Sequence, residues 1–331
     1  MAIIISYSSL NMAAEGDNIR WYTHTGDRRV PDDATHVIVD ASVTVIPADA
    51  FSEHPNIVEV IFDVNGVNGK KVEEFAFTRC PSLRRVIMPG VEIVEGSAFI
   101  ECYSLTDVEC GKLEIISEYA FDGCTSLRSI DLPSAKTVEG CAFNFCTDLT
   151  NVIFGSMLER IKWGAFYDCR SLERITIPLK DGMLTADDIF QGCENLKHVD
   201  LVDGPIHETV AALQLEEWRN DMYEEINSIN QILPTVDAGV SEEDDDVGGK
   251  ARAIRTWIRS VLGKIIHYKA EHQRLLNEQV ATTLEHSLSQ DIVMNNVLPF
   301  LELPSYTFEV GDHEEGEEQD HLDSEEEDDE E

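Results

Sequence analysis

The sequence predicts an α+β solenoid, an array of about seven stacked coils that ends in a C-terminal helical hairpin. Three observations predict this fold class. Phenylalanine recurs seven times with its neighbours in a fixed register, and six of the eight cysteines fall at one position of that repeat. After Asp203 the spacing of apolar residues changes from about 22 residues to steps of three and four, which are typical of helices.

The repeat is built around phenylalanine. Alanine precedes six of the seven copies, an aliphatic residue follows six positions later, and apolar residues follow at nine and eleven positions. A unit of this size cannot bury its apolar face alone, whereas stacked units bury it against each other. The copies, separated by 26, 22, 22, 22, 23 and 24 residues, are Phe51, Phe77, Phe99, Phe121, Phe143, Phe166 and Phe190.

Each copy contains one short strand pattern. The residues nine to eleven after phenylalanine alternate between apolar and other types, as in Ile130, Asp131 and Leu132, which is typical of a strand with one buried face. Proline follows at Pro133 and at the equivalent positions of two other copies, where its missing N–H ends the strand. We expect parallel strands on one side of each coil and short irregular or helical turns on the other.

The residue ten after each phenylalanine is predicted to point away from the core. These residues are the candidate partner-binding positions: Ile61, Ile87, Glu109, Asp131, Ile153, Thr176 and Asp200. Three isoleucines on a solvent-facing strand surface favour a docking surface. The alternative explanation is the ordinary preference of strands for β-branched residues.

The cysteine column lies three residues after phenylalanine. Its members are Cys80, Cys102, Cys124, Cys146, Cys169 and Cys193, with His54 in the first copy. A regular ladder lacks the converging ligands of a zinc site, so we interpret these thiols as small apolar core residues. Oxidation to disulfides is the alternative, because the expected spacing permits it, and thiols kept reduced indicate a reducing compartment.

The motif Ala-Phe-x-x-Cys-x-x-Leu-x-x-Ile-x-Leu-Pro resembles the BspA-type leucine-rich repeat from about Val43 to Val202. Repeats of this type are found in adhesins of bacteria and protists and in many eukaryotic proteins. The flanks "VPDDATHVIVDASVTVIPADAF" and "HYKAEHQRLLNEQVATTLEHSL" resemble a diatom protein family that has the same plan and no assigned activity. The resemblance implies a leucine-rich-repeat solenoid with a C-terminal helical region.

Four segments are predicted. Residues 1–42 form an N-terminal segment and cap, 43–204 the solenoid, 205–310 a helical hairpin with an acidic loop at 241–246, and 311–331 a disordered acidic tail.

Helices are predicted over 207–233 and 250–290. The first carries acidic residues and the second begins with basic ones, so we expect an antiparallel pair held partly by charge. The second also carries a heptad-like apolar seam and is longer than the first, which favours self-association as a homodimer or a second partner.

The formal net charge is −39, with 64 acidic and 25 basic residues. This excess disfavours nucleic acid and anionic membranes and favours basic protein partners. No stretch is apolar enough to span a bilayer or to act as a secretory signal, so we expect a cytoplasmic or nuclear location.

No nucleotide-binding, hydrolase or metalloprotease motif is present, so we expect no enzyme activity, no cofactor and no metal site. The sequence favours a non-catalytic protein-interaction scaffold that uses the strand face. The alternatives are an acidic-tail binder or chaperone of basic proteins, and a surface adhesin.

Overall fold

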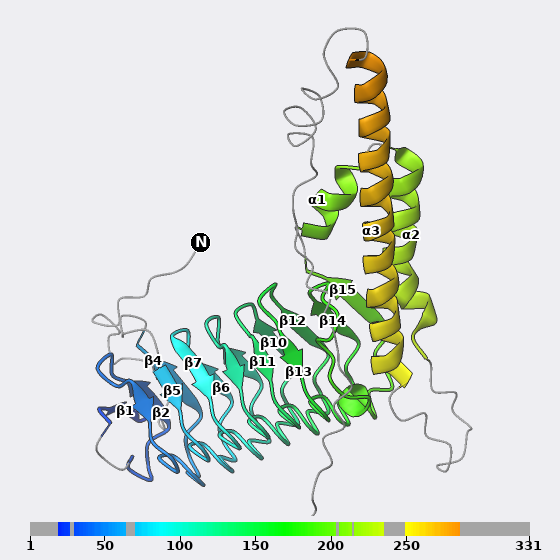
Figure 1. Ribbon diagram of the computed structural model, residues 1–331. Helices are drawn as coiled ribbons and strands as arrows, with labels where there is room; N and C mark the ends of the chain where they lie inside the picture. Colours follow the sequence, from blue (N-terminus) through cyan, green and yellow to red (C-terminus); the bar gives the residue numbers. More distant parts are fainter. Residues whose placement is uncertain are drawn as a thin grey trace, which may run out of the picture.

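The computed structural model describes residues 19–26, 30–63, 70–202, 205–213, 215–234 and 249–284. Figure 1 shows a row of coils that runs from the N-terminal strands to a set of helices standing against the last coil. The α+β solenoid with a C-terminal helical hairpin is confirmed. The acidic loop at 241–246 and the acidic tail at 311–331 lie outside the described residues.

One side of the solenoid is made of parallel strands. A five-stranded sheet with the order β1-β2-β4-β6-β8 is followed along the stack by a four-stranded sheet with the order β10-β12-β14-β15. Their strands are β1 (Trp21–His24), β2 (His36–Val39), β4 (Glu59–Phe62), β6 (Arg85–Ile87), β8 (Asp107–Glu109), β10 (Ser129–Leu132), β12 (Asn151–Phe154), β14 (Arg174–Ile177) and β15 (His198–Leu201). We call their solvent side the strand face. β1 and β2 precede the first repeat and extend its sheet.

A second parallel sheet lies on another side of each coil, where only turns were expected. Its order is β13-β11-β9-β7-β5-β3. The strands are β3 (Val45–Ile46), β5 (Lys70–Val72), β7 (Val91–Val94), β9 (Ile115–Ile116), β11 (Thr137–Val138) and β13 (Arg160–Ile161). Five of these six strands have only two or three residues, so the sequence shows an apolar column five residues before phenylalanine and no alternating pattern.

The third side of each coil is a ladder of hydrogen-bonded turns, which we call the turn side. The Phe77 N–H donates to Ala98 O at 2.7 Å, and the Phe99 N–H donates to Ala120 O at 2.8 Å. Residues two before and two after phenylalanine have positive φ even where they are not glycine, for example Tyr119 at 56°. Left-handed backbone at a bulky residue is disfavoured, so the stacked coils must impose it.

The phenylalanine rings form one continuous stack inside the coils. Neighbouring ring centroids are 4.7 Å apart at Phe51 and Phe77 and 5.8 Å apart at Phe166 and Phe190. The first five pairs are within 2° of parallel. The leucine and cysteine columns are buried around them, and so is the alanine column apart from the half-buried Ala50. The repeat read from the sequence therefore forms a single hydrophobic spine.

The cysteine thiols do more than fill space. The Cys102 thiol donates to Phe77 O at 3.0 Å, and the Cys124 thiol donates to Phe99 O at 3.2 Å. All six column cysteines bond the phenylalanine carbonyl of the preceding coil in this way. In the first copy His54 Nε2 lies 2.9 Å from Pro31 O. The interpretation as a purely apolar filler was therefore incomplete.

Among the described residues, three helices follow the last coil: α1 (Pro205–Ala211), α2 (Glu216–Ile232) and α3 (Gly249–Leu284). The single helix expected over 207–233 is two helices. Leu213 and Trp218 are five residues apart, a step that does not keep one apolar face, and the chain leaves the helix between them. The Arg219 guanidinium donates to Leu213 O at 2.6 Å and satisfies a carbonyl at this break.

α2 and α3 run antiparallel. Trp257 is 1% exposed and donates to Glu225 O at 3.0 Å, and further along α3 Tyr268 donates to Asp221 at 2.7 Å. Lys264 pairs with both of these acidic residues at 2.9 and 3.0 Å. The expected charge pairing between the two helices is present at this lysine.

Basic residues in the first turns of α3 contact the solenoid instead. Arg255 pairs with Asp187 and donates to Ala186 O at 2.8 Å, and Arg259 pairs with Asp181 at 3.0 Å. Asp181 and Asp187 lie just before η2 (Asp188–Phe190), on the last coil. The basic start of α3 therefore fixes the hairpin onto the end of the stack, and only part of it faces the acidic helix.

We expect Gly155→Ala to lower the free energy of unfolding by about 2 kcal/mol, because overpacking against backbone has little room to relax. A Cβ at Gly155 would lie 2.0 Å from Pro133 O in the preceding coil. Gly111→Ala is the control, since nothing lies within 4 Å of its added methyl group. Urea unfolding followed by circular dichroism measures both. Equal stabilities for the two variants would contradict this packing.

We expect Asp187→Asn to destabilise the protein by about 1–2 kcal/mol, because it removes the carboxylate that faces a partly buried guanidinium. The Arg255 side chain is 19% exposed, and burial lowers its pKa. Asp33→Asn is the control, because the Arg20–Asp33 pair is 66% and 62% exposed and such pairs contribute little. Thermal unfolding of both variants checks this, and an equal loss in the control would contradict the docking role.

Candidate partner-binding surface

The predicted binding column lies along the strand face, but its seven members are not equally accessible. Glu109, Asp131 and Ile153 are exposed, and Ile87, Thr176 and Asp200 are half-buried. Ile61 is only 6% exposed, so the expectation that it faces solvent was wrong. In the sheet register it lies between Ile38 and Ile87, and side chains of this size cover one another at strand spacing.

The N-terminal part of this face is charged and internally paired. Arg85 lies 2.9 Å from Asp107, 2.5 Å from Glu109 and 3.6 Å from Glu59. The hydrogen bond with Glu109 raises the pKa of Arg85. Three carboxylates share this one guanidinium, so the ion pairs hold the cluster together and leave it with an excess of negative charge.

The middle of the face is the more open part. Ile153 on β12 is 38% exposed, and its neighbours in register are Asp131 on β10 and Thr176 on β14. Asn151 on the same strand has a buried side-chain oxygen that accepts no hydrogen bond from the described residues. This area combines an exposed apolar side chain with polar groups on a rigid sheet, which suits protein docking.

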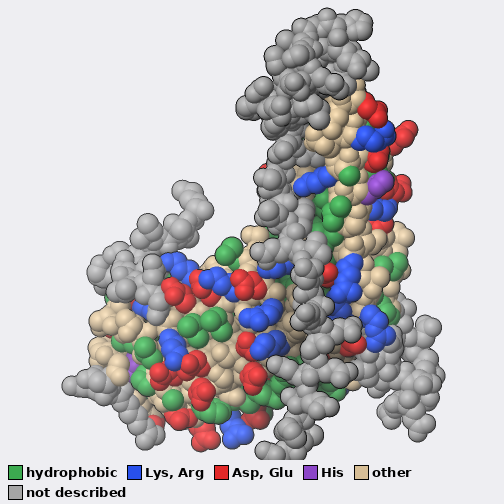
Figure 2. Space-filling model, viewed as in Figure 1, with side chains coloured by type: hydrophobic (Ala, Val, Ile, Leu, Met, Phe, Trp, Pro, Cys, Tyr) green, Lys and Arg blue, Asp and Glu red, His purple; other side chains and the backbone are tan. Residues whose placement is uncertain are grey.

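The second sheet carries its own charge ladder. Lys71 pairs with Glu95 at 2.5 Å, Lys136 with Glu114 at 2.6 Å, and Lys162 with Glu139 at 2.7 Å. Figure 2 shows acidic and basic side chains interspersed over the visible face of the solenoid. These pairs link successive coils and leave no large surface of a single charge sign on this view.

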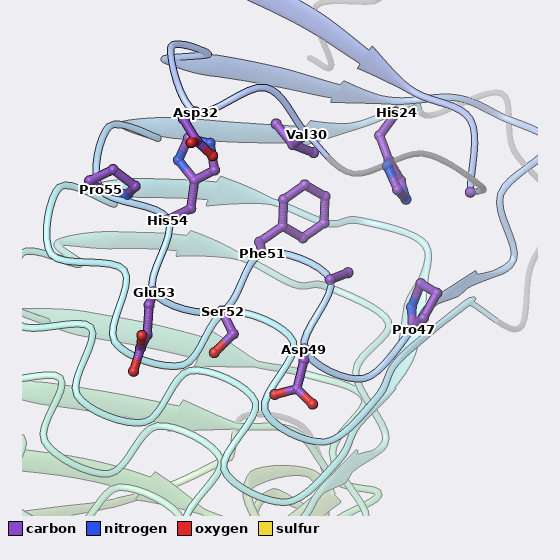
Figure 3. Close-up of a pocket in the computed structure, with 12 residues that line it drawn as sticks. His24, Val30, Asp32, Pro47, Asp49, Phe51, Ser52, Glu53, His54 and Pro55 are labelled. Atoms are coloured by element: carbon purple, nitrogen blue, oxygen red, sulfur yellow. The ribbon is translucent and has the colours of Figure 1, made fainter.

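A pocket of about 490 Å³ lies at the N-terminal end of the stack. Figure 3 shows Phe51 at its centre, with His24 on one side and His54 on the other. The His24 ring lies 5.1 Å from the Phe51 ring in an edge-on arrangement. Val30 is also buried here. His24, Val30 and His54 therefore surround the Phe51 ring at the end of the stack, where a preceding coil would otherwise lie.

A metal site and a reactive thiol each place requirements on the titratable side chains of the described residues. Within these ranges no three His, Cys, Asp or Glu side chains gather in a way that could hold a metal ion. Burial raises the pKa of the Cys110 thiol to about 12, and it raises the pKa of Cys146 well above its ordinary value. These thiols stay protonated at neutral pH and are poor nucleophiles.

Comparison with known protein families identifies the repeat. The family model for the BspA type leucine rich repeat region matches residues 32–137 and 114–210, in six copies. The chain belongs to the BspA-type leucine-rich-repeat family. A search of curated proteins found no match.

Solved structures of leucine-rich repeat proteins are similar to about half of this chain. A leucine-rich repeat protein from Bacteroides ovatus is 24% identical with a TM-score of 0.39, and the match covers 53% of this chain and 47% of that one. One from Eubacterium ventriosum is 20% identical with a TM-score of 0.37, covering 50% and 54%. The T. pallidum leucine rich repeat protein is 23% identical with a TM-score of 0.36, covering 50% and 69%. The chain spans about half the length of the first two. None of the helices in the described ranges has the length and apolar character needed to cross a membrane.

We expect the native protein to react with Ellman's reagent about a thousandfold more slowly than free cysteine, because its thiols are buried and protonated. All eight cysteines are free and buried, and Cys141 is the least enclosed at 8% exposure, so it should react first. Absorbance at neutral pH measures the rate, and unfolding in guanidinium should release all eight. Rapid reaction of one or more column thiols in the folded state would contradict the buried ladder.

Proposed function

We propose that this chain is a non-catalytic scaffold whose strand face docks a protein partner around Ile153. Leucine-rich-repeat proteins generally act as protein-interaction scaffolds. The observation that carries the proposal is an exposed isoleucine at the centre of a sheet whose side chains are already ordered. Such a surface loses little conformational entropy when a partner binds.

The helical hairpin is proposed to serve self-association or a second partner. On α3 Ile266 is 54% exposed, and on α2 Ile232 is 51% exposed and Tyr223 37%. Exposed apolar residues on helices that already pack against the solenoid favour a further protein contact. The heptad-like seam itself is used within the chain, because Ile254, Ile258 and their neighbours are buried.

Two alternatives remain as proposals. Binding or chaperoning of basic proteins is supported by the net charge of −39. A surface adhesin is supported by the resemblance to bacterial BspA-type proteins and would require export. The eight free buried thiols favour a reducing compartment, so we propose a cytoplasmic or nuclear location in preference to the adhesin role.

The strand-face proposal is tested with Ile153→Arg. Full-length tagged protein is used to capture partners from native cells, and the partners are quantified by mass spectrometry. We expect the variant to lose its main partner by about tenfold, because a charge at the centre of an interface is costly. Ile115→Arg is the control, since Ile115 is 36% exposed on the second sheet. Equal capture by both variants and the unchanged protein would contradict the proposal.

Self-association is tested by sedimentation equilibrium. We expect Ile266→Arg to shift the full chain from dimer to monomer, because the charge would be buried at a helix interface. A wild-type chain that is monomeric at micromolar concentration would exclude the homodimer and leave the second-partner role.

A further inference from the structure

A set of aromatic side chains lies at the surface of the turn side, away from the strand face. We call Tyr119, Phe145, Trp163 and Tyr167 the aromatic patch. Phe145 is 43% exposed and Trp163 is 42% exposed. Tyr119 and Trp163 meet edge to face at 6.2 Å, and Phe145 and Tyr167 do so at 6.0 Å.

The repeat does not require aromatic residues at these positions. Tyr119 stands two before a repeat phenylalanine and Phe145 two after one, where the third repeat has Ser97 and Glu101. Both aromatic residues have positive φ, at 56° and 53°, which bulky side chains disfavour. An exposed phenylalanine and a half-buried tyrosine at strained backbone positions therefore call for a reason other than stability of the solenoid.

Small residues leave room for the rings. A Cβ at Gly140 would lie 2.4 Å from the indole of Trp163, so that indole lies directly over the glycine backbone. Gly123 takes the position in the fourth repeat that Phe145 takes in the fifth. Along the chain, the residue that follows each repeat phenylalanine stands between the positions two before and two after that phenylalanine.

In the fourth repeat that residue is Asp122. Its side chain is half-buried beside the Asn144 side chain, and the Gly123 N–H donates to Asn144 O at 2.9 Å. Asn144 immediately precedes Phe145, and the charge of Asp122 also acts on Tyr119 in its own coil. None of the ion pairs found among the described residues joins Asp122 to a lysine or arginine. Burial raises the pKa of Asp122 to about 6.

We propose that the aromatic patch and Asp122 bind the cationic side chain of an arginine or lysine on a basic peptide segment. The carboxylate would pair with the cation, and the ring faces would hold it by cation–π contact and stacking. The patch lies away from the strand face, so this proposal and the proposed function can fail independently.

Charge complementarity selects this occupant. The basic residues of the turn side near the patch are already paired, Arg79 with Glu101 at 2.7 Å and Arg170 with Asp168 at 3.2 Å. Glu118, next to Tyr119, is exposed. A bound cation would stabilise the charged form of Asp122, which burial disfavours. The net charge of −39 would also attract basic segments to the surface.

The test uses the full chain and a fluorescein-labelled Gly-Ser peptide that contains three arginines. Fluorescence anisotropy in about 150 mM NaCl limits non-specific attraction by screening long-range charge. We expect Asp122→Asn to weaken binding about fivefold or more, as loss of a partly desolvated charge contact does. Asp131→Asn, the same charge change on the strand face, should alter binding by less than about twofold.

Phe145→Ala tests the rings. Phe75 is also an exposed phenylalanine of the turn side at 43%, so Phe75→Ala is its matched control. We expect only Phe145→Ala to weaken binding, by about threefold or more, because a cation–π contact is lost. A second peptide carries citrulline in place of arginine, which keeps the shape of the side chain without its charge. The affinity of this citrulline peptide should be no higher for the unchanged protein than for Asp122→Asn.

A pH series gives a readout that a structural role would not produce. Affinity for the arginine peptide should rise between about pH 5 and pH 7 as Asp122 ionises, and Asp122→Asn should remove that part of the rise. The other titratable groups that interact with Asp122 are Glu101, Tyr103, Tyr119, Cys124, Cys141 and Cys146. The hydrogen bond with Arg79 lowers the pKa of Glu101, and burial raises the pKa of the tyrosines and cysteines, so none of them titrates in this window.

Three results would overturn the proposal. They are equal weakening by Asp122→Asn and Asp131→Asn, equal binding of the citrulline peptide, and no measurable binding to the unchanged protein. Thermal unfolding checks that Asp122→Asn still folds. At pH 7 its unfolding temperature should be equal to or higher than that of the unchanged protein, because the substitution removes a desolvated charge.

Discussion

The structure depends on matching the stack of phenylalanine rings to the hydrogen-bond spacing of the backbone. Parallel strands lie about 4.8 Å apart, close to the 4.7–5.4 Å between the first six ring centroids. Each of the first six repeat phenylalanines is bonded twice to the next coil, because its backbone N–H donates to a carbonyl there and its own carbonyl accepts that coil's cysteine thiol. Ring, amide and thiol therefore repeat with one period, and neighbouring coils must follow it.

The same constraint explains the ends and the surface. The ring spacing reaches 5.8 Å at Phe190, where the coils give way to the helices, and α3 fixes the hairpin there through Arg255 and Arg259. At the other end of the stack, the His24 ring meets the Phe51 ring edge-on. Between the ends, the coils hold turn residues such as Tyr119 in left-handed backbone, which places aromatic side chains at the surface. One rigid core thus presents the strand face and the aromatic patch in fixed positions.

Much of the spine could be predicted from the sequence because its columns are strictly spaced. The phenylalanine column is stacked and the cysteine column is buried as expected. The second sheet could not be predicted, because a pair such as Ile115–Ile116 is too short to show a period. The exposure of Ile61 was predicted wrongly, because a position in the repeat predicts the direction of a side chain but not how much of it the neighbouring side chains cover. The docking of Arg255 on Asp187 was missed because opposite charge on α2 offered an equally good partner.

The central claim is that the coils form one interlocked spine, and hydrogen exchange on a matched pair of variants tests it most directly. Phe77 is fully buried in the stack, whereas Phe75, two residues earlier, is 43% exposed. The account predicts that Phe77→Leu speeds amide exchange in the coils on both sides, at Phe51 and Phe99, while Phe75→Leu leaves both unchanged. Exchange that is unaltered in the neighbouring coils of Phe77→Leu, or equally altered in both variants, would contradict the interlocked spine.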